Sequence, residues 1–202
     1  IPVATLLYSL TMWRWPPLLQ IQWDDIYEGK TFKMSRNLQD KIVKRICELD
    51  WPDNARVSHE NGKGFCIGAT FQKGRPYVAT YSKAHGDLAL LINEAIEKSF
   101  NNREGKTFRW TSLQINIGGN YAPRRDSNNF GLSAICLLGS FTRGKFVCPG
   151  FTLDSDNRGE WTLLNGSNTH WSEPSSGLRV SIVAFYHTYE RILPREERVQ
   201  LL

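Results

Sequence analysis

Residues 178–187 read LRVSIVAFYH, a run of β-forming side chains with a single charge, Arg179, near its start. The run predicts a β-strand. An arginine inside an apolar strand is unfavourable unless its guanidinium has a partner. Glu173 and Glu190 are the acidic residues that flank the run and could pair with it. The stretch therefore predicts both a strand and a site, with Ser181 two positions after the arginine.

The rest of the chain divides into a helical part and a β-rich part. Residues 38–49 and 87–100 have apolar residues at helical spacing, with Asn37 and Asp87 as the expected N-caps. Residues 65–82 predict a hairpin. Short β-forming segments separated by glycine predict further strands near 108–117, 131–138, 144–152 and 160–164. We expect an α+β chain whose C-terminal half is a sandwich or a jelly roll.

We expect a single domain over residues 1–202, because this length fits one hydrophobic core. Residues 1–105 should form a supporting region of helices and a hairpin. Residues 106–190 should form the jelly-roll core that carries the site.

The composition, with 41% hydrophobic and 22% charged residues, is that of an ordinary globular protein. The net charge of +5 permits an anionic partner such as nucleic acid. No apolar run reaches the ~20 residues of a membrane span, so we expect no membrane partner. The four cysteines lack CxxC spacing, which favours buried reduced thiols and an intracellular location, cytoplasmic or nuclear.

A second unusual stretch, YAPRRDSNNFG, covers residues 121–131 and gathers charge and amide groups before a predicted strand. Asp126 lies two residues after Arg124, and His170 follows 44 residues later inside GSNTHWSEP. Asp126 alone would be interpreted as a turn residue. His85-Gly86-Asp87 also has a histidine and an aspartate at this spacing, but it precedes a helix and is better explained as a cap.

The order of these residues resembles the 2-oxoglutarate- and Fe(II)-dependent dioxygenases, whose fold is a double-stranded β-helix of jelly-roll type. Their pattern is His-x-Asp, a distal His, and Arg-x-Ser on a late strand. Here, over residues 112–187, N-x-G-x-S, L-G-x-F and G-x-F are followed by H…P…G-x-R-x-S-x-V-x-F. This motif pattern is most similar to that of a protist, fungal and viral branch of the family, which is related to enzymes that oxidise DNA bases.

The resemblance implies Fe(II) and 2-oxoglutarate as cofactors. Such iron is held by two imidazoles and one carboxylate, which leaves positions open for the cosubstrate and oxygen. Asp126 and His170 match metal ligands, and Arg179 with Ser181 matches the clamp on the far carboxylate of 2-oxoglutarate. The remaining residues that we expect to line the pocket are Tyr121, Asn128 and Trp161.

The chain departs from the pattern at two positions. Arg124 stands where the proximal histidine is expected, and an arginine has no lone pair to give to a metal. Its charge would also repel a dication by roughly 8 kcal/mol at ~4 Å and an effective dielectric of ~20, as an upper bound. Thr142-Arg143-Gly144 stands where the similar proteins usually have a Gly-Gly pair.

Three hypotheses follow. The first is a dioxygenase that oxidises a C–H bond of a substrate, for which a nucleic-acid base, a small molecule and a protein side chain are all open. The second is a catalytically inactive relative that serves as a binding or regulatory protein without a complete iron site. The third is that Arg124 is a variant residue in an otherwise working enzyme.

Overall fold

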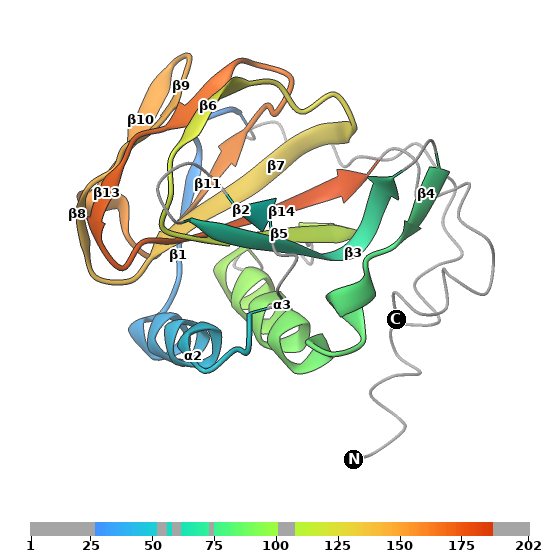
Figure 1. Cartoon of the computed structure of the whole chain (residues 1–202). Coiled ribbons are helices and arrows are strands. Elements are labelled where there is room, and N and C mark those ends of the chain that lie inside the picture. Colours follow the sequence, from blue (N-terminus) through green and yellow to red (C-terminus); the bar gives the residue numbers. More distant parts are fainter. Residues whose placement is uncertain (1–26, 52–55, 58–61, 73–74, 101–107, 188–202) are drawn as a thin grey trace.

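The computed structural model describes residues 27–51, 56–57, 62–72, 75–100 and 108–187. Within these residues the chain forms one large antiparallel sheet, two smaller sheets across from it, and two helices beneath it (Figure 1). This is the α+β jelly-roll architecture that the pattern of strands predicts.

The large sheet has the strand order β1-β11-β7-β14-β5-β3-β2, and β4 pairs with β3. Its strands are β1 (Thr31–Lys33), β2 (Arg56–Val57), β3 (Lys63–Gln72), β4 (Arg75–Val78), β5 (Ser112–Ile117), β7 (Asn129–Leu138), β11 (Glu160–Leu164) and β14 (Val180–His187). The strand from the LRVSIVAFYH stretch is central: Ser181 of β14 lies opposite Leu137 of β7 on one side and Asn116 of β5 on the other.

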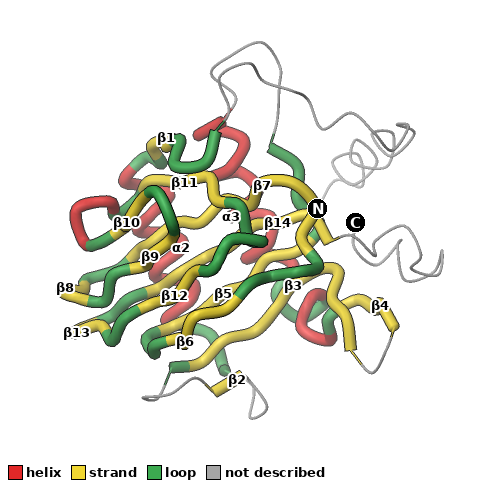
Figure 2. Tube along the Cα trace, turned by 90° about the horizontal axis from the view of Figure 1, so that it is seen from above, coloured by secondary structure: helices red, strands yellow, loops and turns green. Residues whose placement is uncertain are grey.

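The smaller sheets are built from short strands that lie across the barrel from the large sheet (Figure 2). One has the order β10-β9-β12-β6, and the other consists of β13 and β8. Their strands are β6 (Tyr121–Arg124), β8 (Phe141–Arg143), β9 (Phe146–Cys148), β10 (Phe151–Leu153), β12 (His170–Ser172) and β13 (Ser175–Gly177).

The two faces of the large sheet bury different sets of side chains. Val180, Ile182 and Ala184 of β14 pack toward α2 (Arg36–Cys47) and α3 (Gly86–Phe100), with Ile42 and Ile92 fully buried against the sheet. Each such aliphatic side chain stabilises the fold by about 1.5–3 kcal/mol. The alternate residues of β14, including Ser181, face the barrel interior. The helix layer therefore supports the sheet from outside and leaves its inner face for a site.

A second apolar cluster fills the space between the sheets. It joins Ile135 and Leu137 of β7 to Phe146 and Cys148 of β9 and to Leu164 of β11. The cluster fixes the separation of the large and small sheets, because its side chains interdigitate from both. The site lies beside it.

Several predicted elements need correction. α2 begins at Arg36 with Ser35 as the N-cap residue, so Asn37 lies in the first turn and is not the cap. α3 begins at Gly86, and Asp87 lies inside its first turn, where its carboxylate bonds Arg45 of α2 at 2.6 Å. Residues 144–152 contain two strands, β9 and β10, with a turn between them.

Other predictions hold. β11 spans Glu160–Leu164 as predicted, and β3 and β4 form the hairpin in the expected region. The four cysteines are free, with Cys136 and Cys148 buried, but Cys47 is exposed, which contradicts the prediction of four buried thiols. No helix in the described residues is long and apolar enough to cross a membrane. The intracellular location and the division at residue 105 stay predictions; β1 and β3, from the first 105 residues, share the large sheet with the later strands.

Candidate functional site

A small cavity opens between the inner face of the large sheet and the strands β6 and β12. Its interior is about 30 Å³, which is room for about two water molecules. The apolar part of its wall includes Ile135, Leu137, Phe146 and Val183. The polar part consists of Asn116, Tyr121, Arg124, His170, Ser172, Arg179 and Ser181. Among the described residues, two guanidinium cations and no acidic side chain line the cavity.

Arg179 lies at the inner end of the cavity with only 3% of its surface exposed. Its Nη1 donates to the carbonyl oxygens of Gly144 at 2.6 Å and Glu173 at 2.9 Å, and its Nη2 donates to the carbonyl of Gly119 at 2.5 Å. Burial lowers the pKa of this guanidinium from its usual value. The carbonyl dipoles hold the side chain in place without neutralising it.

The sequence offered two acidic residues, Glu173 and Glu190, as partners of Arg179. Glu173 contributes its backbone oxygen, and Glu190 lies outside the described residues. The close approach also explains Gly144, which has φ +71: a Cβ there would lie 2.7 Å from Nη1 of Arg179.

A chain of hydrogen-bonded polar side chains, here called the polar ladder, runs through Tyr121, Asn116 and Ser181 on the same cavity wall as Arg179. Tyr121 Oη donates to Asn116 Oδ1 at 3.0 Å, and Asn116 Nδ2 donates to Ser181 Oγ at 3.3 Å. Gln114 Nε2 also donates to Asn116 Oδ1, at 2.9 Å. These bonds orient Asn116 and Ser181, the inward-facing neighbours on β5 and β14, toward the cavity.

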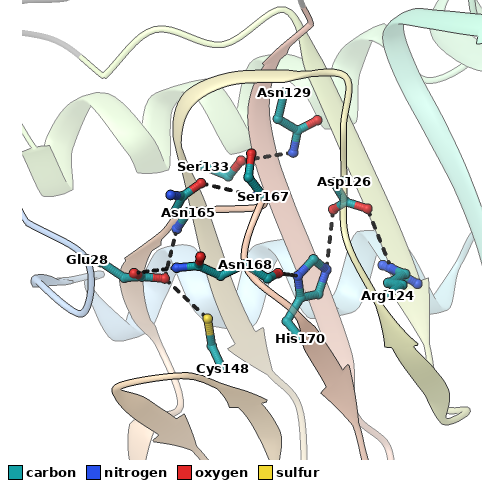
Figure 3. A network of polar contacts seen from close by, with 10 residues as sticks. All are labelled: Glu28, Arg124, Asp126, Asn129, Ser133, Cys148, Asn165, Ser167, Asn168 and His170. Atoms are coloured by element: carbon teal, nitrogen blue, oxygen red, sulfur yellow. Dashed lines mark hydrogen bonds and ion pairs between the residues drawn. The ribbon is translucent and has the colours of Figure 1, made fainter.

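Arg124 and His170, which line the cavity, both contact Asp126 (Figure 3). Arg124 of β6 lies directly opposite His170 of β12 in the antiparallel register. Asp126 Oδ2 lies 3.4 Å from His170 Nε2, and Asp126 Oδ1 lies 3.6 Å from Arg124 Nε. His170 is 3% exposed, whereas the arginine and aspartate side chains are 35% and 34% exposed. The guanidinium of Arg124 also covers the ring of Tyr121, 4.9 Å from its centroid.

A chain of polar contacts links Nδ1 of His170 to Glu28 through Asn168 (Figure 3). This Nδ1 lies 2.9 Å from the backbone oxygen of Asn168, and Asn168 Nδ2 donates to Glu28 Oε2 at 3.0 Å. The other oxygen of Glu28 accepts hydrogen bonds from the backbone N–H of Asn165 at 3.1 Å and from the thiol of Cys148 at 3.2 Å. Burial and this carboxylate raise the pKa of Cys148 to about 12. Glu28 therefore ties the loop before β12 to β9 and fixes the orientation of the imidazole.

The donors at the mouth do not fit the iron centre that the resemblance implies. Asp126 and His170 offer one carboxylate oxygen and one imidazole nitrogen, but the third position holds the cation Arg124, which cannot coordinate a metal. Across the described parts of the chain, no three His, Cys, Asp or Glu side chains come together in a way that could hold a metal ion.

The structure brings most of the expected site residues together. Tyr121, Arg124, His170, Arg179 and Ser181 line one cavity, and Asp126 contacts two of them from its rim.

Two expected pocket residues lie elsewhere. Asn128 lies in the turn before β7 and is not part of the cavity wall. Trp161 is fully buried in the core cluster that contains the helices, on the other face of the large sheet, so the prediction that it lines the pocket is wrong.

Sequence reasoning missed Asn116, Trp171, Ser172 and Glu28. The sequence does contain a pattern that points to Asn116. The polar residues Gln114 and Asn116 alternate with apolar residues in SLQINI, which indicates that they lie on the inner face of β5. Ser172 follows His170 by two residues on β12 and lines the same cavity, but this strand was not predicted. No local sequence pattern points to Glu28 as a residue of the site.

No family model matches the sequence, and no curated protein matches it. Solved structures do match in fold. NgTET1, solved in complex with 5mC DNA, aligns with a TM-score of 0.54 at 13% identity, over 76% of this chain and 69% of that chain. An oxidoreductase of the 2OG-Fe(II) oxygenase family from Burkholderia pseudomallei aligns with a TM-score of 0.50 at 19% identity, over 72% of this chain and 78% of that one.

The class that these structures define is the jelly roll of the 2OG-Fe(II) oxygenases, and this chain has that fold. At such identities the likeness is one of fold alone. The activity of the chain has to be argued from its own site, in which Arg124 stands beside the two donors Asp126 and His170.

Proposed function

We propose that this chain is a non-catalytic binding protein with the fold of the 2OG-Fe(II) oxygenases, and that it binds a small carboxylate in the cavity without iron. The observation that carries the proposal is Arg179. Its guanidinium is buried at the inner end of the cavity and is held by three carbonyl oxygens.

The N–H donors of Arg179 that make no hydrogen bond within the described residues support this proposal. A guanidinium has five N–H donors. The bonds to Gly144, Glu173 and Gly119 use two donors of Nη1 and one of Nη2. Within the described residues this leaves Nε–H and one N–H of Nη2 available to a ligand. A carboxylate can accept such charge-assisted hydrogen bonds through both of its oxygens.

The charge balance of the cavity also supports an anionic ligand. A buried cation is unfavourable unless an anion compensates it. The described residues on the cavity wall include Arg124 and Arg179 but no carboxylate, and Asp126 contacts Arg124 and His170 from the rim. A bound carboxylate would place its charge beside Arg179, and Ser181 on the same wall offers a hydroxyl donor.

Calorimetry with 2-oxoglutarate in the presence of a chelator tests this function. The wild type should bind, and Arg179→Gln should bind at least about tenfold more weakly, because a charge-assisted hydrogen bond contributes about 1.5–3 kcal/mol. Arg179 also organises three backbone carbonyls, so Ser181→Ala is a milder second variant, with an expected loss of several-fold. Binding that is absent in the wild type, or unchanged in both variants, would overturn the proposal.

A second candidate is a metal-dependent oxygenase that oxidises a C–H bond. Asp126 Oδ2 and His170 Nε2, 3.4 Å apart, favour it, since two ligands about 2.0–2.2 Å from one metal lie close to this separation. For this activity Arg124 must leave the site. Succinate formation from 2-oxoglutarate by wild-type protein supplied with Fe(II) would favour the oxygenase over the binding protein.

Nucleic acid is a further partner that we propose. The net charge of +5 supports it, as does the fold shared with NgTET1, which was solved with 5mC DNA. Binding of a DNA duplex should weaken steeply as salt rises, with a slope that reports the number of phosphates contacted. Weak binding with no salt dependence would count against this partner.

A further inference from the structure

We infer that Arg124 and Ser172 form a second anion site in the same cavity, so that the ligand is a small dicarboxylate held at both ends by the protein alone. The inference rests on the proposed function and deepens it, because it assigns the second acidic group of the ligand to the place where the family resemblance would put iron.

Ser172 is the first observation that points to a ligand. Its Oγ is buried and has no hydrogen-bond partner among the described residues. The residue lines the same cavity as His170, two positions earlier on β12. A buried hydroxyl without a partner is destabilising. An acceptor oxygen inside the cavity would relieve this penalty.

Arg124 is the second observation. Its Nε lies 3.6 Å from Asp126 Oδ1, which is beyond hydrogen-bond length. The guanidinium rests on the Tyr121 ring, 4.9 Å from the centroid, and is about one-third exposed. Its contact with Asp126 is therefore a loose ion pair, and its N–H donors can turn to a stronger acceptor.

Tyr121 relates this cation to Arg179. The Tyr121 ring lies under Arg124, while its hydroxyl donates to Asn116, which in turn donates to Ser181, two residues after Arg179. Both guanidiniums therefore line the same cavity as this tyrosine. A dicarboxylate with a short carbon chain can reach both, whereas a monocarboxylate can satisfy only one.

The size of the cavity limits the ligand further. An interior of about 30 Å³ cannot enclose a dicarboxylate unless side chains at the mouth move. Tyr121, Arg124 and Trp171 line it and are partly exposed, so they can move outward. The ligand must also displace Asp126 from Arg124, which makes Asp126 a competitor for the same guanidinium.

Glutarate and glutaramate, in which an amide replaces one carboxylate, test the inference by calorimetry in the presence of a chelator. The wild type should bind glutarate at least about tenfold more tightly than glutaramate, as expected for one extra charge-assisted contact. Arg124→Gln and Ser172→Ala should reduce this preference, because the affinity for glutarate falls further than the affinity for glutaramate. Arg125→Gln is the matched control, because its Nε bonds Thr169 instead, and it should keep the preference.

Asp126→Asn should change the affinity for glutarate in the opposite direction from Arg124→Gln. It removes the competing carboxylate, so the affinity for glutarate should rise several-fold. Equal binding of glutarate and glutaramate by the wild type would overturn this inference and leave the proposed function intact. No binding of either ligand would overturn the proposed function and this inference with it. A preference that survives Arg124→Gln, or a loss of glutarate affinity in Asp126→Asn, would also overturn the second anion site.

Discussion

Asp126 Oδ2 lies 3.4 Å from Nε2 of the buried His170, so a carboxylate and an imidazole are aligned at the mouth of the jelly roll. The same carboxylate lies 3.6 Å from Arg124 Nε on its other side. A carboxylate and an imidazole thus lie close enough to share a ligand, while the guanidinium of Arg124 lies on the other side of the carboxylate. On the proposed function the site binds anions, and we expect one substitution, at Arg124, to convert it into a site for a metal ion.

Arg124→His should create metal binding. The change removes a cation and places an imidazole on β6 opposite His170, which completes two imidazoles and one carboxylate. Mn(II) or Fe(II) affinity measured by anaerobic calorimetry should rise at least about tenfold, since a repulsion of several kcal/mol is removed. In the same background, 2-oxoglutarate turnover should become detectable as succinate.

Two variants control this experiment. Asp126→Ala in the Arg124→His background should abolish the gain, because a carboxylate ligand is lost. Arg125→His also exchanges an arginine for an imidazole, but Arg125 is exposed and bonds Thr169, so metal affinity should stay at the wild-type level. If Arg124→His and Arg125→His bind metal equally, Arg124 does not occupy the ligand position.

Much of the fold could be predicted because its long strands have strong local patterns. β11 and β14 are rich in β-branched and aromatic residues, and their bounds were predicted closely. The small sheets could not be predicted in the same way, because their strands are three or four residues long and β6 contains Pro123. Such segments have too few residues for a period of two to be recognised.

The site was predicted only where residues fall inside a spaced motif. Arg179 and His170 were found by their order, whereas Ser172 depends on the unpredicted strand β12. Glu28 lies 140 positions from Asn168, and no local pattern records such a contact. Trp161 was assigned to the wrong face of its strand, since its apolar neighbours Leu163 and Leu164 on β11 hide the alternation.

Arg143→Gly should stabilise the protein. Arg143 has φ 60, and it is the non-glycine residue with positive φ in the described part of the chain. That conformation costs a side chain roughly 1–2 kcal/mol, and glycine avoids this strain but has more freedom in the unfolded chain. The expected net gain is about 1 kcal/mol in urea unfolding. Thr142→Gly, one residue earlier in β8, should instead destabilise; a gain from both would argue against strain at Arg143.

Stability should fall as the pH is lowered through the range just below 6.5, in part because of His187. Burial lowers the pKa of this histidine below its usual value. Between the lowered pKa and about 6.5 the unfolded chain binds more protons than the folded chain, so unfolding becomes easier as pH decreases. The slope per histidine is at most about 1.4 kcal/mol per pH unit.

His187→Gln should flatten this dependence when urea unfolding is compared at several values between pH 7.5 and pH 5. His85 also has a pKa lowered by burial, so His85→Gln should flatten it further. If the single and double variants follow the wild-type slope, neither histidine is the source of the pH dependence.

Gly144→Ala should disrupt both the fold and the carboxylate site, and Gly150→Ala provides its matched control. Both glycines have positive φ, +71 and +94, so alanine is strained at either position by roughly 1–2 kcal/mol. At Gly150 a Cβ meets nothing within 4 Å, whereas at Gly144 it would lie 2.4 Å from Ser175 Cβ and 2.7 Å from Arg179 Nη1. We therefore expect losses of about 1 kcal/mol for Gly150→Ala and about 3 kcal/mol or more for Gly144→Ala. Gly144→Ala should also lose 2-oxoglutarate binding because Arg179 is displaced, while Gly150→Ala keeps it. Equal losses of stability would mean that backbone strain alone explains Gly144, and that its contact with Arg179 is not tight.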